Sequence, residues 1–506
     1  MFDERPMKKR VVVIGGGIAG LSAGVYAQKC GFDVTILESH NIAGGNCTAW
    51  RRGAYLFEGG MHWLTGSSKS DALNKLWRHI GALNDNVTVR YDEPFMGFNH
   101  GNTVIKIYRD VDLTEKHLLE LSPADAKEIK KFCGFIRRVK NLVMPVTDLR
   151  GVRVTKKSSM PLSMLFSVLS AVRTLGALSK LSRDKFINSF THEGIRDMIR
   201  ASTSEKNGIL AFVFTLATIA RGEGGFPEGG SLPFVDRIVK TFTRMGGKIL
   251  YDTRADRVIT ENNPVNGRRA IGVITGAKKI YVDAVIITAD TMAIDHLFDV
   301  PPKARWLDEM KAVTEPTMAT FVSLGINADL KKYQKEYSFK LKSPIKIGDE
   351  IYEFMSLYNY ADDPVYSPEG KTALTIPLGG DTYDFWKKAK EENRYAGEKQ
   401  RVANAVIEAL SIQMPETAGK VEVVDVATPL TYERYCANWK GSWMTEMKPG
   451  IKMKTYPAVI NGLDGVYFAG HRMTPPGGLP IALVSGRMAV QHLCRDTGTL
   501  FVSEED

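Results

Sequence analysis

Val11-Val12-Val13-Ile14-Gly15-Gly16-Gly17-Ile18-Ala19-Gly20 is the stretch that decides the fold of this chain. Its first four residues are apolar and β-branched, as in a strand buried within a parallel sheet. Small and apolar residues follow at helical spacing over 18–29, and residues 32–38 indicate a second strand. A strand, a glycine-rich turn, a helix and a second strand together predict a β-α-β dinucleotide-binding unit.

The three spaced glycines each have a separate role in such a turn. Gly15 permits the tight turn, Gly17 lets the backbone approach a pyrophosphate, and Gly20 allows close packing of the helix on the strand. The helix, whose first residues are Ile18 and Ala19, then presents free N–H groups and a positive dipole end to the phosphates. Glycine-rich turns also arise by chance. The predicted strand before this turn and the helix after it favour a dinucleotide-binding turn.

An acid at the end of the second strand selects among dinucleotides. Glu38 follows Gly20 by eighteen residues, where a carboxylate accepts the ribose hydroxyls and repels a 2′-phosphate, which disfavours NADP and leaves FAD or NAD. The glycine pair of Gly44-Gly45-Asn46, and the segment 53–62 that ends at His62, let the chain run close beneath an extended cofactor. No second GxGxxG is present to hold a nicotinamide dinucleotide. We therefore predict FAD, with ordinary loop glycines as the alternative reading of these pairs.

A third glycine-rich block lies near the C-terminus. A strand over 465–470 closes on Gly470 and His471, and the run Gly478-Leu479-Pro480 opens a helix that includes Ile481. A helix that begins there would direct its positive end toward the negative charge near N1 of a reduced flavin. The alternative is a simple connection between a strand and a helix.

Composition places the chain among folded globular proteins. Apolar residues make up 44% and charged residues 25% of its 506 residues, a length that favours two domains. The formal charge of +10 fits nucleic acid, an anionic membrane or a dinucleotide. We find no zinc-finger spacing, no other metal-ligand pattern and no aromatic RNA-binding signature, so we predict no metal and no nucleic-acid partner.

Cysteine usage and the N-terminal segment bear on the compartment. The five cysteines form no CxxC pair, which favours a reducing compartment and excludes a redox-active disulfide beside the flavin. Residues 8–28 imitate a signal peptide, with three basic residues before an uncharged run, but five glycines in that run serve a nucleotide-binding turn better than a membrane helix. We expect a cytoplasmic protein without a signal peptide or transmembrane helix.

The nucleotide-domain patterns recur in three separate stretches, which predicts two domains interleaved in sequence. We expect an α/β fold in which a Rossmann-type FAD-binding domain is interleaved with an α+β substrate domain. The FAD-binding parts are expected at 8–70, 223–300 and 456–506. The substrate-domain parts are expected at 71–222, where the chain is mixed and includes helical patterns, and at 301–455.

These blocks, in this order, resemble the family of FAD-dependent phytoene desaturases, carotenoid cis–trans isomerases and retinol saturases, within the wider amine-oxidase-like flavoprotein group. The middle of the chain fits as well, with Pro-Glu-Gly-Gly-Ser at 227–231, a glycine pair at 246–247 and then Val258, whose counterpart touches adenine through its backbone. The resemblance implies that flavin N5 exchanges hydride with the substrate. It also implies contacts to FAD from Gly15, Gly17, Gly20, Glu38, Gly45, Val258 and Gly470.

Two positions depart from that pattern. Asn46 stands where many relatives have arginine, which weakens one phosphate contact, and His471 stands where many flavoproteins of the wider group have an acid. Met61-His62-Trp63 most resembles the saturase branch. Hydride chemistry on an unactivated C–C bond needs alignment and exclusion of water more than an acid or base, so no catalytic residue is predicted, and His62 and His471 are expected to pack or hydrogen-bond near the flavin ring.

The predicted function is desaturation or saturation of C–C bonds in a long apolar isoprenoid, such as a carotenoid or retinoid. The alternatives are a redox-neutral carotenoid isomerase, an amine oxidase and a non-enzymatic prenyl-binding escort protein. Residues 160–178 form a candidate membrane-contact helix, with a serine and threonine stripe opposite a face that includes Leu165 and Leu169. A helix packed on the substrate domain is the alternative, and peripheral membrane contact is the expectation.

Overall fold

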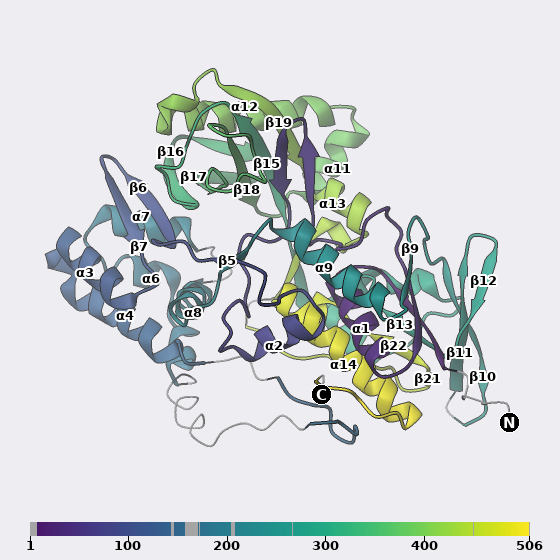
Figure 1. Ribbon diagram of the computed structural model, residues 1–506. Helices are drawn as coiled ribbons and strands as arrows, with labels where there is room; N and C mark the ends of the chain where they lie inside the picture. The colour runs from purple at the N-terminus through teal and green to yellow at the C-terminus, as the bar shows by residue number, and fades with distance from the viewer. Residues whose placement is uncertain are drawn as a thin grey trace.

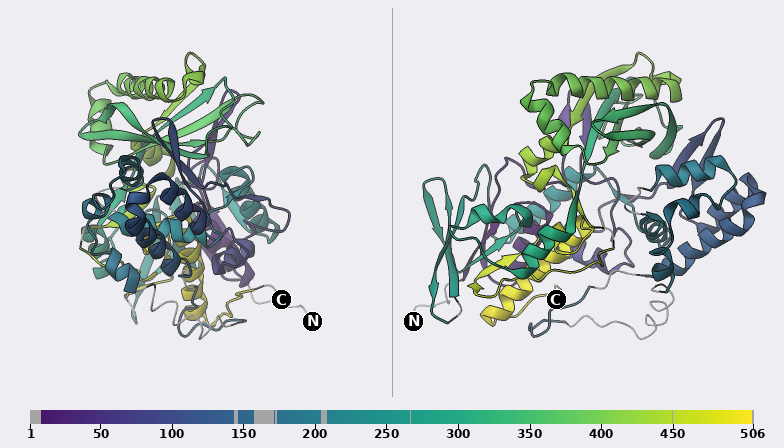
Figure 2. Two further views of the ribbon diagram at one scale, coloured as in Figure 1. Left: turned by 90° about the vertical axis from the view of Figure 1, so that its left-hand side faces the viewer. Right: turned by 180° about the vertical axis from the view of Figure 1, so that it is seen from behind.

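The structure is a computed structural model that describes residues 8–142, 146–156, 171, 173–203, 208–265, 267–448 and 450–504. Three parts are visible in it: a parallel sheet with helices, a mixed sheet covered by α12 (Tyr395–Gln413), and a helical lobe (Figure 1). In Figure 2 the long helix α14 (Leu479–Thr497) lies against the part that holds the parallel sheet.

The parallel sheet is assembled from distant stretches of chain. Its five strands, in spatial order, are β22 (Val466–Phe468), β13 (Ala284–Ile287), β1 (Arg10–Ile14), β2 (Asp33–Leu37) and β9 (Lys248–Leu250). Val13 lies opposite Ile286 on one side and Ile36 on the other. The strand order and the parallel register are those of a dinucleotide-binding sheet, in agreement with the fold class predicted from the glycine-rich turn.

Alternation along β1 builds two cores. Val11 and Val13 pack with α1 (Ile18–Lys29), α9 (Ser231–Arg244) and α14. Val12 and Ile14 point to the other face, against the sheet formed by β10 (Arg257–Asn263), β11 (Gly267–Thr275), β12 (Lys278–Tyr281) and β21 (Leu463–Asp464). A strand that is buried on both faces needs the continuous apolar run seen in the sequence.

The mixed sheet has seven strands. In spatial order they are β19 (Val421–Ala427), β15 (Ala319–Ile326), β18 (Thr372–Gly379), β17 (Glu350–Asn359), β16 (Glu336–Ile347), β6 (Met96–His100) and β7 (Thr103–Ile107). Helix α12 covers one face through Val402, Val406 and Leu410. The segment 71–222 therefore contributes the strands β6 and β7 to this sheet in addition to its helices.

The helical lobe packs on the β6–β7 hairpin. Phe98 and Ile105 of the hairpin share a core with Phe132, Met198 and Val213. The helices of the lobe are α3 (Val111–Leu121), α4 (Ala126–Val139), α6 (Arg183–Ile187), α7 (Glu193–Ala201) and α8 (Gly208–Ala220). The hairpin thus joins the lobe to the mixed sheet.

Shorter elements connect these parts. They are β3 (Ala49–Arg52), β4 (Tyr55–Glu58), α2 (Ala72–His79), β5 (Val89–Arg90), β8 (Phe226–Pro227), α10 (Arg305–Val313), β14 (Thr314–Thr317), α11 (Tyr383–Glu391), α13 (Pro429–Cys436) and β20 (Met444–Met447). Most of the candidate membrane-contact helix, including Leu165 and Leu169, lies outside the described residues, and residues 173–178 are helical. Among the described residues, no helix combines the length and apolar character that crossing a bilayer requires.

Candidate functional site

The glycine-rich turn between β1 and α1 has the geometry that its spacing predicts. Gly15 has φ +102°, and a Cβ on Gly20 would lie 1.9 Å from the carbonyl oxygen of Gly15. A Cβ on Gly17 would meet no atom closer than 3.9 Å. Gly17 is the N-cap of α1 and no side chain caps the helix, so the N–H groups of Ile18 and Ala19 are left for a ligand.

Glu38 lies directly beside this turn. Its carboxylate accepts hydrogen bonds from the backbone N–H of Gly16 at 2.7 Å and of His40 at 2.8 Å. The residue is 8% exposed, so its position is fixed before any ligand binds. An anchored acceptor at the end of β2 is what recognition of a ribose diol requires.

The second glycine pair runs alongside the first turn. The N–H of Gly44 donates to the carbonyl of Gly16 at 2.9 Å, and a Cβ on Gly45 would lie 3.3 Å from Cα of Gly17. Asn46 accepts a hydrogen bond from the Asn438 side chain at 2.8 Å and donates to the carbonyl of Ser442 at 3.5 Å. Asn46 therefore binds a neighbouring turn of the protein, where an arginine would carry a charge to a phosphate.

The C-terminal block closes the same site. The N–H of Gly470 donates to Oγ of Ser485 at 3.0 Å, and α14 begins after Gly478, which has φ +84° and no capping side chain. A Cβ on Gly486 would lie 2.4 Å from the carbonyl of Ala19. The uncapped first turn of α1 thus contacts the second turn of α14, which itself begins uncapped at Leu479. We call residues 15–20, Glu38, 44–46 and 470–481 the cradle.

Two predicted contacts have apolar side chains that pack inward. Val258 is 2% exposed and shares a core with Val12 and Leu37, at the strand ends that flank the turn. Ile481, in the first turn of α14, is 7% exposed. The structure therefore places Val258 beside the cradle and Ile481 within it, and leaves their backbone as the part that could face a ligand.

The cradle contains one buried ion pair that the sequence analysis missed. Arg472 is 1% exposed and donates to both carboxylate oxygens of Asp290 at 2.6 Å. It also donates to the hydroxyls of Ser442 and Thr445. Burial alone would raise the pKa of Asp290, but the charge and hydrogen bonds of Arg472 outweigh it and the pKa is lowered.

His471 is a cradle residue whose imidazole forms no hydrogen bond with the described residues. Both of its ring nitrogens are buried and have no hydrogen-bond partner among the described residues. Burial, together with the neighbouring Arg472, lowers its pKa to about 3, so the imidazole is neutral. Buried polar atoms are almost always paired. Unpaired nitrogens next to two uncapped helix N-termini and an open Gly17 fit a bound flavin with polar ring atoms and phosphates.

Glu58 organises the loop that follows β4, and no motif identified it. Its carboxylate is fully buried and accepts from the N–H groups of Gly60 and Met61 and from the N–H and hydroxyl of Ser231. The hydroxyl of Tyr366 donates a fifth hydrogen bond at 2.9 Å. An acid immediately before a glycine pair was the available signal, but its partners lie far away in the sequence.

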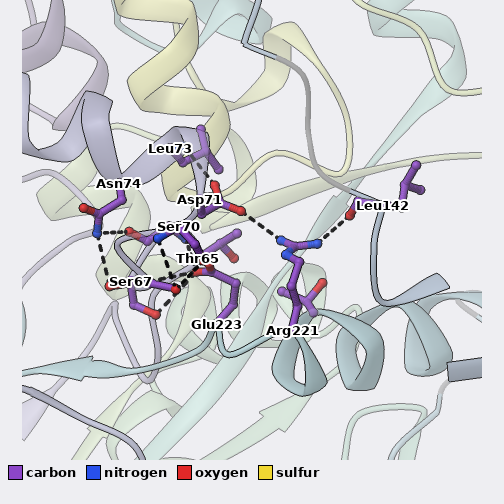
Figure 3. Close-up of polar contacts among 12 residues, drawn as sticks. Thr65, Ser67, Ser70, Asp71, Leu73, Asn74, Leu142, Arg221 and Glu223 are labelled. Carbon is purple, nitrogen blue, oxygen red and sulfur yellow. Dashed lines mark hydrogen bonds and ion pairs between the residues drawn. The ribbon is translucent and has the colours of Figure 1, made fainter. Parts of the chain in front are cut away.

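A second polar network fixes the next stretch of chain. Arg221, at the end of α8, pairs with Asp71 at 3.0 Å and donates to the carbonyl of Leu142, as Figure 3 shows. Glu223 accepts from the N–H of Gly66 at 2.7 Å. These bonds join residues 66–71 to the helical lobe and hold in place the chain that follows His62.

His62 lies where the cradle meets the mixed sheet. A Cβ on Gly60 would be 2.0 Å from the carbonyl of Asn46, which places the 60–62 loop against the cradle. Nδ1 of His62 shares a 2.8 Å hydrogen bond with the hydroxyl of Tyr360, and its ring stacks on Tyr358 at 3.7 Å. The contact between Gly60 and Asn46 therefore forms a strip that runs from Glu38 through the glycine turns of the cradle to His62.

The parallel-sheet fold and the cradle together are typical of a flavin-dependent oxidoreductase. The family model for flavin-containing amine oxidoreductases matches residues 18–494. The chain belongs to this family and is an oxidoreductase with a flavin cofactor.

Individual relatives resemble the chain at low identity. A phytoene desaturase (lycopene-forming) from a Paracoccus species is 25% identical over 98% of this chain and 99% of its own length. An all-trans-retinol 13,14-reductase from Danio rerio is 21% identical over 85% of this chain and 76% of its own length. A chloroplastic prolycopene isomerase from Daucus carota is 22% identical over 96% of this chain and 80% of its own length.

The fold also resembles solved structures. The crystal structure of an oxidoreductase from Methanosarcina mazei superposes with a TM-score of 0.58 at 17% identity, and the match covers 96% of this chain and 100% of that one. This similarity concerns the fold alone. The chain thus falls among flavoproteins related to desaturases, reductases and isomerases of polyenes.

Proposed function

We propose that the protein uses FAD to exchange hydride with a C–C bond of a long apolar isoprenoid, as a desaturase or saturase. The observation that carries the choice of cofactor is Glu38, anchored by two backbone N–H groups beside Gly17. Its carboxylate suits an unphosphorylated ribose and repels a 2′-phosphate. The strip from Glu38 through Gly17 to His471 and His62 has donors for a pyrophosphate in its middle and for a flavin ring at its far end.

The residues of the chain divide the binding task. Bound FAD supplies a hydride acceptor or donor at its ring. The N–H groups at the start of α1 bind the phosphates, and the start of α14 stabilises negative charge on the ring. His62, Tyr358 and Tyr360 contribute stacked, uncharged rings beside the cradle, which suits an apolar chain and the exclusion of water from it.

Redox-neutral isomerisation of a polyene is the second candidate. The isomerase from Daucus carota is similar to this chain over nearly the same length as the desaturase, and both activities would use the same cradle. Product analysis separates the two, because an isomerase changes no substrate mass and leaves the flavin in its starting redox state.

We further propose that the protein contacts membranes peripherally, since a lipid-soluble polyene must arrive from a bilayer. The sequence segment 160–178 is the candidate. Co-sedimentation with vesicles of phosphatidylglycerol and phosphatidylcholine should detect binding, and Leu165→Glu with Leu169→Glu should reduce it at least about fivefold, because each buried leucine contributes roughly 1.5–3 kcal/mol. Unchanged binding would contradict this segment as the anchor.

The decisive experiment follows the flavin directly. The purified holoprotein, oxidised or photoreduced, is incubated anaerobically with phytoene, all-trans-retinol and oleic acid, while the flavin absorbance and the product mass are recorded. We expect a change in flavin redox state together with a product that differs by two hydrogens for at least one polyene, and none for oleic acid. A panel that never perturbs the flavin would overturn the isoprenoid assignment. Oxidation of primary amines instead would favour an amine oxidase.

A further inference from the structure

A stack of aromatic rings connects the buried carboxylate of Glu58 to His62. Tyr366 donates to Glu58 at 2.9 Å and stacks on Tyr360 with ring centroids 4.3 Å apart. Tyr360 bonds Nδ1 of His62 at 2.8 Å, and Tyr358 lies parallel to the imidazole at 3.7 Å with an interplanar angle of 3°. The imidazole is therefore held in one plane, with one of its two nitrogens occupied.

The other nitrogen of His62 is available. Nε2 makes no hydrogen bond with the described residues, whereas Nδ1 is fixed by Tyr360. Burial, with a smaller contribution from Lys335, lowers the pKa of His62 to about 3, so the ring is neutral near pH 7. Burial also raises the pKa of Tyr360 well above its ordinary value, so its hydroxyl keeps its proton.

Lys335 is the cation of this cluster. Its ammonium lies 3.4 Å from the ring centroid of Phe226, 5.7 Å from that of Tyr360 and 3.7 Å from Asp92. It forms no hydrogen bond with the residues that the structure describes. Burial lowers its pKa to about 7. The charged groups around the imidazole are thus Lys335 with Asp92, and Glu58 through the two tyrosines. Glu336 lies opposite Tyr358 on β16, and burial raises its pKa to about 7. Arg90 lies over the ring of Phe226.

The position of His62 matters as much as its hydrogen bonding. It follows Gly60, which contacts the carbonyl of Asn46 in the cradle, and it packs on Tyr358 of β17 in the mixed sheet. A group at this boundary lies between the flavin-binding strip and the face expected to hold the substrate. Few side chains can exchange a proton from a neutral state there, and imidazole is one of them.

We propose that His62 exchanges a proton with the substrate carbon adjacent to the one that exchanges hydride with the flavin. This inference rests on the proposed function. In dehydrogenation, one C–H bond breaks and its electron pair leaves as hydride to FAD, the oxidant. The neighbouring C–H bond breaks, its electron pair becomes the new C=C bond, and the proton moves to Nε2 of His62. In hydrogenation the same bonds form in reverse, with reduced FAD as the reductant.

Tyr360 and Lys335 are positioning residues in this scheme. The scheme requires the tautomer in which Nδ1–H donates to the Tyr360 oxygen. In that tautomer the lone pair of Nε2 is free to accept a proton, and the same bond persists when the ring is protonated. The nearby ammonium of Lys335 makes the imidazolium unstable and so favours return of the proton. A weak base suffices, because loss of hydride leaves a carbon centre whose neighbouring C–H bonds are strongly acidic.

His62→Gln tests the proposal, with His117→Gln as the matched control. His117 is a partly buried histidine that accepts the N–H of Lys106, far from the cradle in the helical lobe. In H62Q the FAD dissociation constant and the flavin spectral shift on adding phytoene or retinol should stay within about threefold of wild type. The single-turnover rate of flavin reduction or oxidation should fall at least about 100-fold, the usual range for general acid–base catalysis. H117Q should match wild type throughout.

Chemical rescue separates proton transfer from packing. His62→Ala should regain at least about tenfold in single-turnover rate when imidazole is added, and the gain should follow the fraction of imidazole in its neutral form during dehydrogenation. Tyr360→Phe should change the tautomer of His62 seen by ¹⁵N NMR of the holoprotein and slow turnover about tenfold. These readouts apply even if H62Q binds FAD poorly.

The possible outcomes distinguish failure of the His62 proposal from failure of the proposed function. A wild type that responds to polyenes while H62Q turns over within threefold of it overturns the role of His62 and leaves the proposed function standing. Loss of FAD from H62Q and H62A, with a normal rate at saturating FAD and no rescue by imidazole, also overturns it, because His62 would then only hold the cofactor. A wild type whose flavin responds to no polyene overturns both.

Discussion

The two sides of the site recognise their ligands by different means. The cradle offers backbone: open glycines, two uncapped helix N-termini and a carboxylate held by N–H groups. The opposite side offers side chains: Glu58, His62 and three tyrosines joined through hydrogen bonds and ring stacking. The cradle binds through backbone that must stay accessible, so an added side-chain atom should impair it. The opposite side depends on contacts between side chains, so a removed atom should weaken it.

Arg472→Met should give the largest loss of stability. It would remove a bidentate partner from Asp290 and leave a buried carboxylate uncompensated, which costs about 3–5 kcal/mol. Urea unfolding followed by circular dichroism measures the change. Arg472→Met combined with Asp290→Leu should recover part of the loss. A loss below about 1 kcal/mol for the single variant would contradict the buried pair.

Gly20→Ala should break the cradle by filling space. Its Cβ would lie 1.9 Å from the carbonyl of Gly15, so the turn must open. We expect at least about 100-fold weaker flavin binding, equivalent to about 2.7 kcal/mol, measured by fluorescence titration. Gly397→Ala in α12 is the control, because its Cβ meets nothing within 4 Å, and it should stabilise by about 0.5–1 kcal/mol. Equal flavin content in the two variants would refute the close approach.

Tyr366→Phe should weaken the opposite side by removing one atom. Glu58 would lose one of five hydrogen bonds, and loss of a bond to a charged group costs about 1.5–3 kcal/mol. Tyr383→Phe removes the hydrogen bonds to both carboxylate oxygens of Glu433 outside the site. It should cost less, because both side chains are partly exposed and water can replace the lost donor. If thermal unfolding ranks the two variants in the reverse order, Glu58 does not organise the loop.

Mild acid should lower stability through histidines on both sides of the site. Burial lowers the pKa of His62 and His471 from 6.5 to about 3. Because the folded chain has the lower pKa, stability is complete above pH 6.5 and falls as the unfolded chain takes up protons, by about 1.4 kcal/mol per pH unit for each histidine. Denaturation between pH 7 and 5 should show a shallower slope in H62Q than in the wild type.

The backbone side of the site was predictable from sequence and the side-chain side was not. The turn at Gly15 to Gly20 needs particular residues at particular spacings, so β1, α1 and β2 were predicted nearly to the residue. Glu58 is brought close to Tyr360 and Lys335 only by the tertiary fold. Glu58 ends β4, whereas the other two lie in loops beside β17 and β16, hundreds of residues later in the sequence. No local spacing encodes such contacts.

The same limit applies to the substrate domain, where the sequence located no individual strands over 71–222. The β6–β7 hairpin lies in a region of helical patterns, and its pairing with β16 is a long-range contact, with Phe98 opposite Ser338. The cysteines also show it, because Cys30 and Cys494 lie far apart in sequence while their thiols are in hydrogen-bonding contact. The domain boundaries and the list of cofactor contacts remain predictions for a flavin-bound structure.

The strand order of the parallel sheet also determines when the protein becomes able to bind its cofactor during synthesis. β1 ends at Ile14, but its neighbour β13 begins at Ala284 and the edge strand β22 at Val466. A nascent chain on the ribosome therefore carries the glycine-rich turn for most of translation without the sheet and helix α14 that complete it. Flavin is expected to load only after Gly470 to Gly486 have emerged, and an N-terminal fragment should expose the apolar faces of β1 and α1 to chaperones.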